Sequence, residues 1–470
     1  MHTPQTITPS AAPAGPSVWR VELVETLKLA LPIALTQLGQ IAMMTTDLAL
    51  IGRLGDHVVA ASALAQIVLF VAFVLGMGIV SAVAPLAAQA YGARQPRMVR
   101  RALRVGLWAA LILGIPLTFV QLYGEEILLA LGQSRQSSEL AARYLFGLAW
   151  CLIPGWWFIA LRGFMSAVNR PEPALWITLV AIPANALIGY LLIYGEFGFP
   201  RLDVLGAGIA TTVVNIGMCV ASFWVCTARH PFKKYRVLGR FWRMDWQLMG
   251  RLIVVGAPIS GAFLLEYGLF ASAALLMGWI STSALAAHQI ALTVASIMFM
   301  VPFGISMAAT VRVGHAVGAR DADATRVAGF TAIALGAIFM AAMAVLAIAT
   351  RHIIPLAFLG AITVENDATA TLAATLLAVG ASFFIADGMQ TVAAGALRGF
   401  NDTRIPLLFS ALCFWAVGFP ACYLLGFSLG GGAVGVWIGL SIGVALYAVL
   451  LVWRFHALTK RGYLPALVGE

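Results

Sequence analysis

Long apolar segments decide what this chain can fold into. Windows of about 20 mostly apolar residues, the length of a membrane-spanning helix, recur twelve times in the 470 residues. Only 10% of the residues are charged, and this many apolar segments cannot share the core of a soluble protein. We therefore expect an all-α polytopic membrane protein with spans near 27–52, 58–86, 103–123, 141–161, 173–195, 205–227, 251–278, 284–311, 327–349, 368–395, 405–426 and 433–455.

The basic residues predict the orientation of these spans, because loops rich in Lys and Arg stay in the cytoplasm. With both termini inside, 24 of the 29 Lys and Arg residues fall on the cytoplasmic side. Arg143 lies at a helix end, and the outer side carries only Arg53, Arg135, Arg201 and Arg351. The net charge of +10 is then a topology signal and not a nucleic-acid-binding surface. We expect a multi-pass protein of the cell inner membrane with both termini in the cytoplasm.

The chain also repeats itself, which indicates a duplicated six-helix unit. The offset is 226 residues over the first helices and 236 further along. Matched positions are Pro32 with Pro258, Gly78 with Gly304, Gly92-Ala93-Arg94 with Gly318-Ala319-Arg320, and Ala160-Leu161-Arg162-Gly163-Phe164 with Ala396-Leu397-Arg398-Gly399-Phe400. An even number of spans per half inserts both halves the same way, so we expect two pseudo-symmetric lobes, a parallel repeat, around a central cavity.

The expected domain organisation follows from these spans. Two six-helix lobes are joined by a basic, amphipathic linker on the cytoplasmic side, and a tail lies at each end. Residues 1–26, rich at their start in Pro, Ala, Ser and Thr, are expected to be a disordered cytoplasmic tail. The remaining parts are the N-lobe 27–227, the linker 228–250, the C-lobe 251–455 and the second cytoplasmic tail 456–470.

Three carboxylates lie inside the apolar spans: Asp47, Glu266 and Asp387. An ionisable group at the bilayer centre costs roughly 2.5–3.5 kcal/mol on insertion scales, so it is normally retained for a function. In the repeat Glu266 matches Gln40 and Asp47 matches Ala273, so a structural need common to both halves does not explain them. No Lys or Arg lies deep in the predicted spans, and the counter-charge must be a proton, a metal cation or a cationic substrate. The alternative is a protonated carboxyl that only makes an interhelical hydrogen bond.

Polar side chains near these acids complete two candidate cation sites, because hard cations prefer oxygen ligands. The C-lobe set is Glu266, Asp387 and Gln390, and the N-lobe set is Asp47, Asn185 and Thr211. A buried Asn or Thr in a membrane helix is, however, often only a helix–helix contact. A lining of Met and aromatic side chains could repack around varied apolar cations, with ordinary packing as the alternative for each: Met43, Phe263, Tyr267, Phe270, Met298, Met300 and Phe384.

With these features placed, residues 25–455 resemble the multidrug and toxic compound extrusion (MATE) family in its bacterial NorM-type branch. The matching motifs are Ala257-Pro258-Ile259 followed by Glu266, Ala286-Ala287-His288-Gln289, and Asp387-x-x-Gln390 continuing into Gly395-Ala396-Leu397-Arg398-Gly399-Phe400 and Asp402-Thr403. The resemblance implies a two-lobed antiporter of twelve helices that expels cationic organic compounds in exchange for Na⁺ or H⁺.

The resemblance also assigns roles to individual residues. Glu266 and Asp387 match the C-lobe cation-site acids of the family, and Asp47 and Asn185 match its N-lobe site. Where relatives often have a second Asn or Asp one turn after Asn185, this chain has Gly189. That departure favours the C-lobe acids as the site of the coupling ion.

We therefore expect a secondary active antiporter that exports cationic or amphipathic drugs and toxins. No enzymatic activity, no cofactor besides the coupling ion Na⁺ or H⁺ and no obligate protein partner are expected. The alternative transporter is a flippase for a lipid-linked saccharide or cell-wall precursor, but such anionic substrates call for a basic cavity. A membrane enzyme would need an acidic cluster at the membrane surface, and the close pair Asp321 and Asp323 is more typical of a solvated turn.

Overall fold

The computed structural model describes residues 17–360, 363 and 366–465, and these residues form helices and their connections. Twelve helical stretches in these ranges are long and apolar enough to cross a membrane. The predicted fold class is therefore confirmed. Most of the predicted N-terminal tail, residues 1–16, lies outside the described residues.

The helices divide into an N-half and a C-half. The N-half comprises α1 Val18–Gly52, α2 Asp56–Ser81, α3 Val83–Gly92, α4 Pro96–Leu122, α5 Gly124–Ala130, α6 Arg135–Leu148, α7 Leu152–Ala167, α8 Glu172–Tyr194 and α9 Asp203–Ala228. The C-half comprises α10 Trp246–Ile280, α11 Thr282–Gly318, α12 Ala322–Thr350, α13 Ile354–Leu359, α14 Asp367–Gly399, α15 Arg404–Ser410, α16 Phe419–Tyr423 and α17 Gly432–Lys460.

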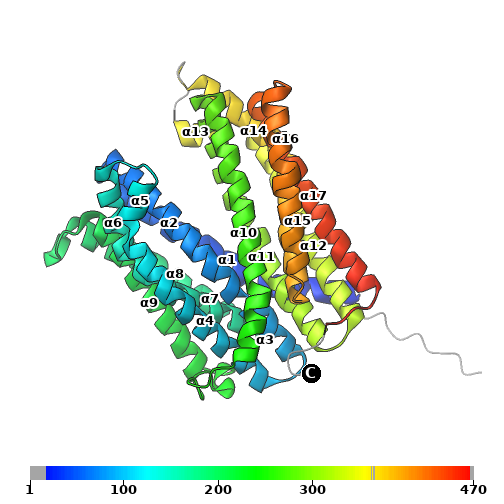
Figure 1. Cartoon of the computed structure of the whole chain (residues 1–470). Helices are drawn as coiled ribbons and strands as arrows, with labels where there is room; N and C mark the ends of the chain where they lie inside the picture. The colour runs from blue at the N-terminus through cyan, green and yellow to red at the C-terminus, as the bar shows by residue number, and fades with distance from the viewer. Residues whose placement is uncertain (1–16, 361–362, 364–365, 466–470) are drawn as a thin grey trace, which may run out of the picture.

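The two halves lie side by side and diverge at one end. In Figure 1 the N-half and the C-half meet at the lower end, where α3 and the C-terminus lie, and separate toward the upper end, where α5 and α13 lie. Between the halves, α1 packs on α11 and α2 packs on α10. The first two spans of each half therefore form the junction.

Several helices extend beyond the predicted spans. α1 begins at Val18, within the predicted tail, because its charged first turns can leave the hydrocarbon layer without ending the helix. α7 continues to Ala167 and α14 to Gly399, so both include an arginine. The expectation that no basic residue lies deep in the spans is wrong for Arg162, which is 5% exposed. Its guanidinium donates a hydrogen bond to Gln37 Oε1 and lies 6.0 Å from the ring centroid of Phe158, so it is accommodated inside the protein.

Glycines allow close approach of the halves at the junction. A Cβ added to Gly78 on α2 would lie 2.7 Å from Ser260 Cα on α10. A Cβ added to Gly304 on α11 would likewise lie 2.7 Å from Ala34 Cα on α1. Each residue of the second pair is the 226-residue match of one residue of the first. The repeat in the sequence is therefore also a repeat of contacts.

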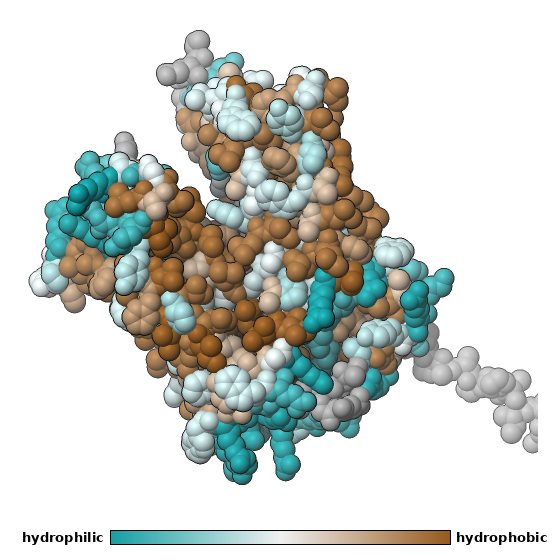
Figure 2. Space-filling view, in the orientation of Figure 1, coloured by the Kyte–Doolittle hydropathy of each residue, from teal (hydrophilic) through white to brown (hydrophobic). Residues whose placement is uncertain are grey.

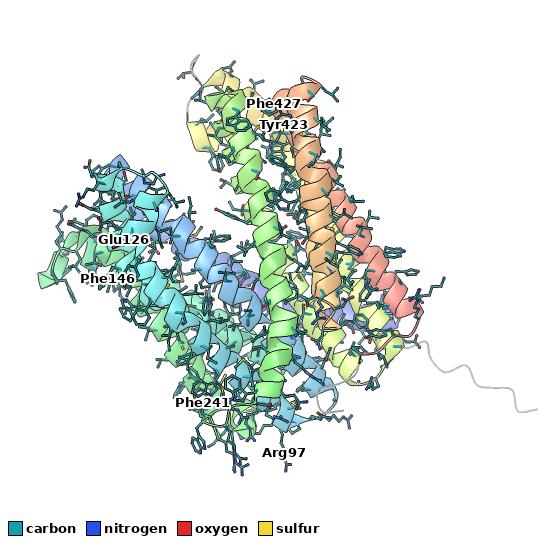
Figure 3. All side chains as sticks on the ribbon, in the orientation of Figure 1. Arg97, Glu126, Phe146, Phe241, Tyr423 and Phe427 are labelled. Atoms are coloured by element: carbon teal, nitrogen blue, oxygen red, sulfur yellow. The ribbon has the colours of Figure 1, made fainter. Side chains whose placement is uncertain are left out.

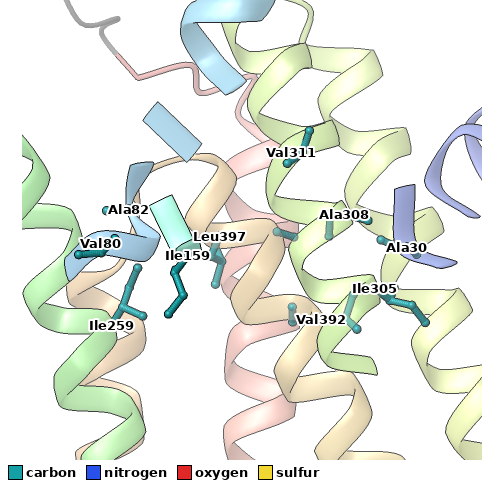
Figure 4. Close-up of a cluster of buried hydrophobic side chains, with 14 of the residues drawn as sticks. Ala30, Val80, Ala82, Ile159, Ile259, Ile305, Ala308, Val311, Val392 and Leu397 are labelled. Atoms are coloured by element: carbon teal, nitrogen blue, oxygen red, sulfur yellow. The ribbon is translucent and has the colours of Figure 1, made fainter. Parts of the chain in front are cut away.

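Apolar packing fills the space around these glycines. Figure 4 shows side chains from both halves in one buried cluster: Ala30, Val80, Ala82, Ile159, Ile259, Ile305, Ala308, Val311, Val392 and Leu397. Small and β-branched residues dominate it, which suits closely packed membrane helices. The lower end is therefore closed by a continuous core.

Polar contacts add to this closure near the loops. The Arg312 Nε of α11 donates to Glu22 Oε1 of α1 over 2.7 Å. Gln89 Nε2 of α3 donates to the Gly399 carbonyl oxygen at the end of α14 over 2.8 Å. In the segment between α9 and α10, the Phe241 carbonyl oxygen accepts a hydrogen bond from Trp108 Nε1 over 2.8 Å.

The upper part of the molecule is open between the halves. Figure 2 shows a cleft with mainly hydrophobic walls between the two bundles, and hydrophilic side chains gathered at the lower end. Figure 3 places Arg97 and Phe241 at that lower end and Tyr423 and Phe427 at the upper end of the C-half. The cleft therefore opens on the side opposite the most basic loops.

Candidate functional site

The C-half brings its three predicted polar residues into one cluster. Glu266 comes from α10, and Asp387 and Gln390 come from α14, where a spacing of three residues puts both on one face. Gln390 Nε2 donates hydrogen bonds to Glu266 Oε1 over 2.7 Å and to Asp387 Oδ1 over 3.0 Å. A single amide group thus bridges two carboxylates from different helices.

This C-half cluster has an excess of negative charge. Asp387 is 5% exposed, and Glu266 is half-buried. In the described part of the chain neither acid has an ion-pair partner. Arg398, further along α14, points its guanidinium to within 5.1 Å of the Phe263 ring centroid. A bridging amide carries no charge, so a proton or a small cation must balance ionised acids here.

The donor set fits a small monovalent cation or a proton better than a divalent metal. The described residues contain no group of three or more His, Cys, Asp or Glu side chains arranged to hold a metal ion. Two carboxylates and one amide oxygen are hard ligands. The cluster can exchange its bound cation because it supplies few protein ligands.

The N-half also brings its three predicted polar residues together. Asn185 Nδ2 of α8 donates to Asp47 Oδ1 of α1 over 2.6 Å. The Thr211 hydroxyl of α9 donates to Asp47 Oδ2 over 2.9 Å. Asn185 Oδ1 is buried and has no hydrogen-bond partner, which is costly unless a ligand uses it. Its position beside Asp47 makes it a candidate cation ligand.

Gly189 follows Asn185 by one turn and leaves this N-half site without a further side chain. It is buried on α8, and an added Cβ would lie 3.0 Å from Leu50 Cδ1. The space that a longer polar side chain would need is therefore occupied by a leucine. The N-half site has three polar side chains and no fourth at this position.

Asp47 faces a cavity of about 270 Å³ in the N-half. Its lining is rich in Met and aromatic residues and has a few polar groups: Gln40, Met43, Met44, Gln66, Leu69, Phe70, Phe73, Tyr144, Leu148, Cys151, Thr211, Asn215 and Met218. An apolar, polarisable wall around one carboxylate suits an organic cation.

The predicted lining residues lie in different environments. Met43 lines the cavity with Asp47. Tyr267 on α10 is 36% exposed, and its ring centroid lies 4.5 Å from that of Phe70 on α2, so it reaches the N-half. Phe263, Phe270, Met298 and Met300 are half-buried in the C-half. Phe384 has no exposed surface and packs against Phe383, so it does not border the cleft in this conformation.

Sequence reasoning missed several residues of the Asp47 cavity. Gln66 on α2 donates to the Tyr144 hydroxyl on α6 over 3.3 Å, and both side chains line the cavity. A glutamine within an apolar span is a visible signal that could have found the first. Tyr144 and Phe70 carry no such signal, because aromatic residues are common in any membrane helix.

Comparisons with known proteins agree with the fold and cover both halves. The family model described as MatE matches residues 32–191 and 258–424. The probable multidrug resistance protein NorM of Rhodopseudomonas palustris is 65% identical over 458 residues, which are 97% of this chain and 96% of that protein. The protein of the same name from Bradyrhizobium diazoefficiens is 59% identical over 440 residues, 94% of each chain. A crystal structure of a eukaryotic MATE transporter superposes with a TM-score of 0.83, covering 94% of this chain and 98% of that chain at 20% identity.

Proposed function

Because the chain belongs to the MATE family of transporters, we propose that it exports cationic or amphipathic drugs through the inner membrane in exchange for Na⁺ or H⁺. It is a multidrug efflux antiporter, and the two relatives described above are named as multidrug resistance proteins. These comparisons give no support to the flippase alternative. The coupling-ion site that we propose is the cluster of Glu266, Asp387 and Gln390.

The bridge through Gln390 is the observation that carries this assignment. Two buried or half-buried acids share one neutral donor and have no basic partner within the described residues. Such a pair binds a proton or Na⁺ when facing one side of the membrane and must release it on the other. Conversion between the two states is driven when the bound ion has different affinities in them.

The Asp47 cavity supports a division of labour between the halves. Its volume of about 270 Å³ far exceeds that of a bare metal ion, and its wall is mostly apolar. An organic cation can place its charge near Asp47 and its apolar part against Met43 and Phe70. We therefore assign the substrate's charge to Asp47 and the coupling ion to the C-half acids.

The orientation follows from the basic loops. If these loops face the cytoplasm, both termini are cytoplasmic and the cleft opens to the outer side. The structure then corresponds to the state that releases drug and takes up the ion. The reverse state requires the junction at the lower end to separate while the upper ends meet.

Drug uptake into everted membrane vesicles tests the proposed function, with Na⁺ and H⁺ gradients imposed separately. The wild type should accumulate a fluorescent organic cation under one of the gradients, and Glu266→Gln and Asp387→Asn should each reduce this to background at equal expression. Glu126→Gln is the matched control, because Glu126 is exposed on α5 far from the cluster. Wild-type accumulation in both cluster variants would refute the ion-site assignment.

A further inference from the structure

A second cavity lies between α8 and α9, and the proposed transport cycle does not use it. Its volume is about 1000 Å³. Most of its wall is apolar, with contributions from Trp176, Val180, Val213, Gly217 and Met218. Trp176 is 66% exposed and Val180 is 68% exposed, so the groove opens on the surface that would face lipid.

One end of this groove is charged. Arg170 precedes α8, Arg229 and His230 follow α9, and all three line the groove together with a single acid, Glu172. The Arg229 guanidinium lies 5.0 Å from the ring centroid of Trp224, at the same end. Neither Arg170 nor Arg229 is part of an ion pair in the described structure. The charged end therefore has an excess of cationic groups.

The length of the groove relates it to the bilayer. Its wall follows α8 from Glu172 to Ile188, which is about 24 Å at 1.5 Å per residue. One leaflet contributes about 15 Å of hydrocarbon, half of a core of about 30 Å. A chain that starts at the charged end can therefore lie against protein through the whole leaflet.

We propose that the groove binds an anionic phospholipid from the leaflet at the basic face of the protein, with an acyl chain between α8 and α9 and the phosphate near Arg170 and Arg229. Arginine forks bind phosphate through paired, charge-assisted hydrogen bonds, and basic pockets between membrane helices recognise anionic headgroups. Tryptophans prefer the interface where headgroup and chain meet. An organic cation is the poorer occupant, because two arginines would repel it.

The groove also adjoins the proposed substrate cavity. Met218 on α9 is 4% exposed and lines both the groove and the cavity that contains Asp47. A lipid chain in the groove therefore supports the outer wall of the substrate cavity through this one side chain. Lipid binding and drug binding are then linked without a shared ligand.

Native mass spectrometry of the full-length protein tests the headgroup contact. The protein is reconstituted in nanodiscs of phosphatidylcholine with phosphatidylglycerol, and the phosphatidylglycerol retained after release is counted. Arg170→Gln with Arg229→Gln should retain about 25-fold less, since each basic residue near an anionic surface contributes about fivefold. The control is Arg326→Gln with Arg461→Gln, which changes two exposed arginines at the same face of the C-half. Equal retention by both double variants would overturn the proposal.

A second variant tests the acyl chain. A Cβ added to Gly217 would meet no atom within 4 Å, so Gly217→Phe fills the groove without displacing protein. It should lower phosphatidylglycerol retention, whereas Val220→Phe, on the same helix and 62% exposed outside the groove, should not. Thermal unfolding in phosphatidylcholine alone verifies that each variant is folded. If inorganic phosphate protects the protein from unfolding as well as phosphatidylglycerol does, or if Gly217→Phe retains lipid normally, the site is not a lipid groove.

Discussion

Gly92 at the end of α3 packs against the backbone carbonyl of His315 on α11, so closely that an added Cβ would overlap the carbonyl oxygen. Gly318 packs in the same way against the carbonyl of Gln89. Each partner in one contact is offset by 226 residues from its counterpart in the other. Reciprocal contacts of this kind characterise a two-fold interface between like surfaces. The halves therefore close on each other as two copies of one ancestral unit.

This closure predicts that larger residues at the glycines favour the state open at the basic face. Overpacking costs typically 1–3 kcal/mol, so Gly92→Val with Gly318→Val should shift the balance of the two states by roughly 5- to 150-fold. Spin labels at Arg94→Cys and Arg320→Cys report the separation, because these loops follow the two glycines. Their distance should increase in the double variant.

Gly250→Val provides the control for the glycine experiment. Gly250 is near the start of α10, and an added Cβ would meet nothing within 4 Å. This variant should leave the label distance unchanged. An unchanged distance in the Gly92 and Gly318 variant as well would mean that these contacts do not hold the basic face closed.

The bridging amide predicts a graded effect within the C-half cluster. Gln390→Leu removes the donor to both Glu266 and Asp387 but keeps their charges. Hydrogen bonds to charged groups contribute about 1.5–3 kcal/mol each, so ion-driven drug uptake should fall by at least about tenfold. Gln390→Asn should recover part of the activity, since it keeps an amide on a shorter chain. Full activity of Gln390→Leu in the everted-vesicle assay would argue that the bridge is incidental.

The sequence predicted the acids of both sites because a charge within an apolar span is visible without a structure. It placed Asn185 and Thr211 with Asp47, and the structure brings the three together. It could not separate lining from core among the aromatics, since Phe384 and Tyr267 look alike in an apolar helix yet differ in exposure. Nor did it place Arg162 inside the protein, because the end of an apolar window does not mark the end of a helix.

The two halves should respond differently to neutralised acids. Asp387→Asn should abolish drug-evoked ion release, while Asp47→Asn should weaken drug binding and keep some release at saturating drug. The measurement is ion release from proteoliposomes as a function of drug concentration, pH and Na⁺. Loss of all coupling in Asp47→Asn with coupling intact in Asp387→Asn would reverse the assignment and place the ion in the N-half.

Gly189 offers a gain of function in the N-half. Gly189→Asp would add a carboxylate one turn after Asn185, whose Oδ1 lacks a partner. Leu50 would have to move by a few tenths of an ångström, since an added Cβ would lie 3.0 Å from its Cδ1. With two acids and the free amide oxygen, the N-half would approach a complete oxygen site for a monovalent cation. We expect measurable Na⁺ binding in the variant with Asp387 also changed to Asn, by isothermal titration in detergent. Gly189→Val is the control, because it makes the same demand on Leu50 without adding a ligand. Equal Na⁺ binding by the Asp and Val variants would show that Asp47 and Asn185 do not form a cation site to which the new carboxylate contributes.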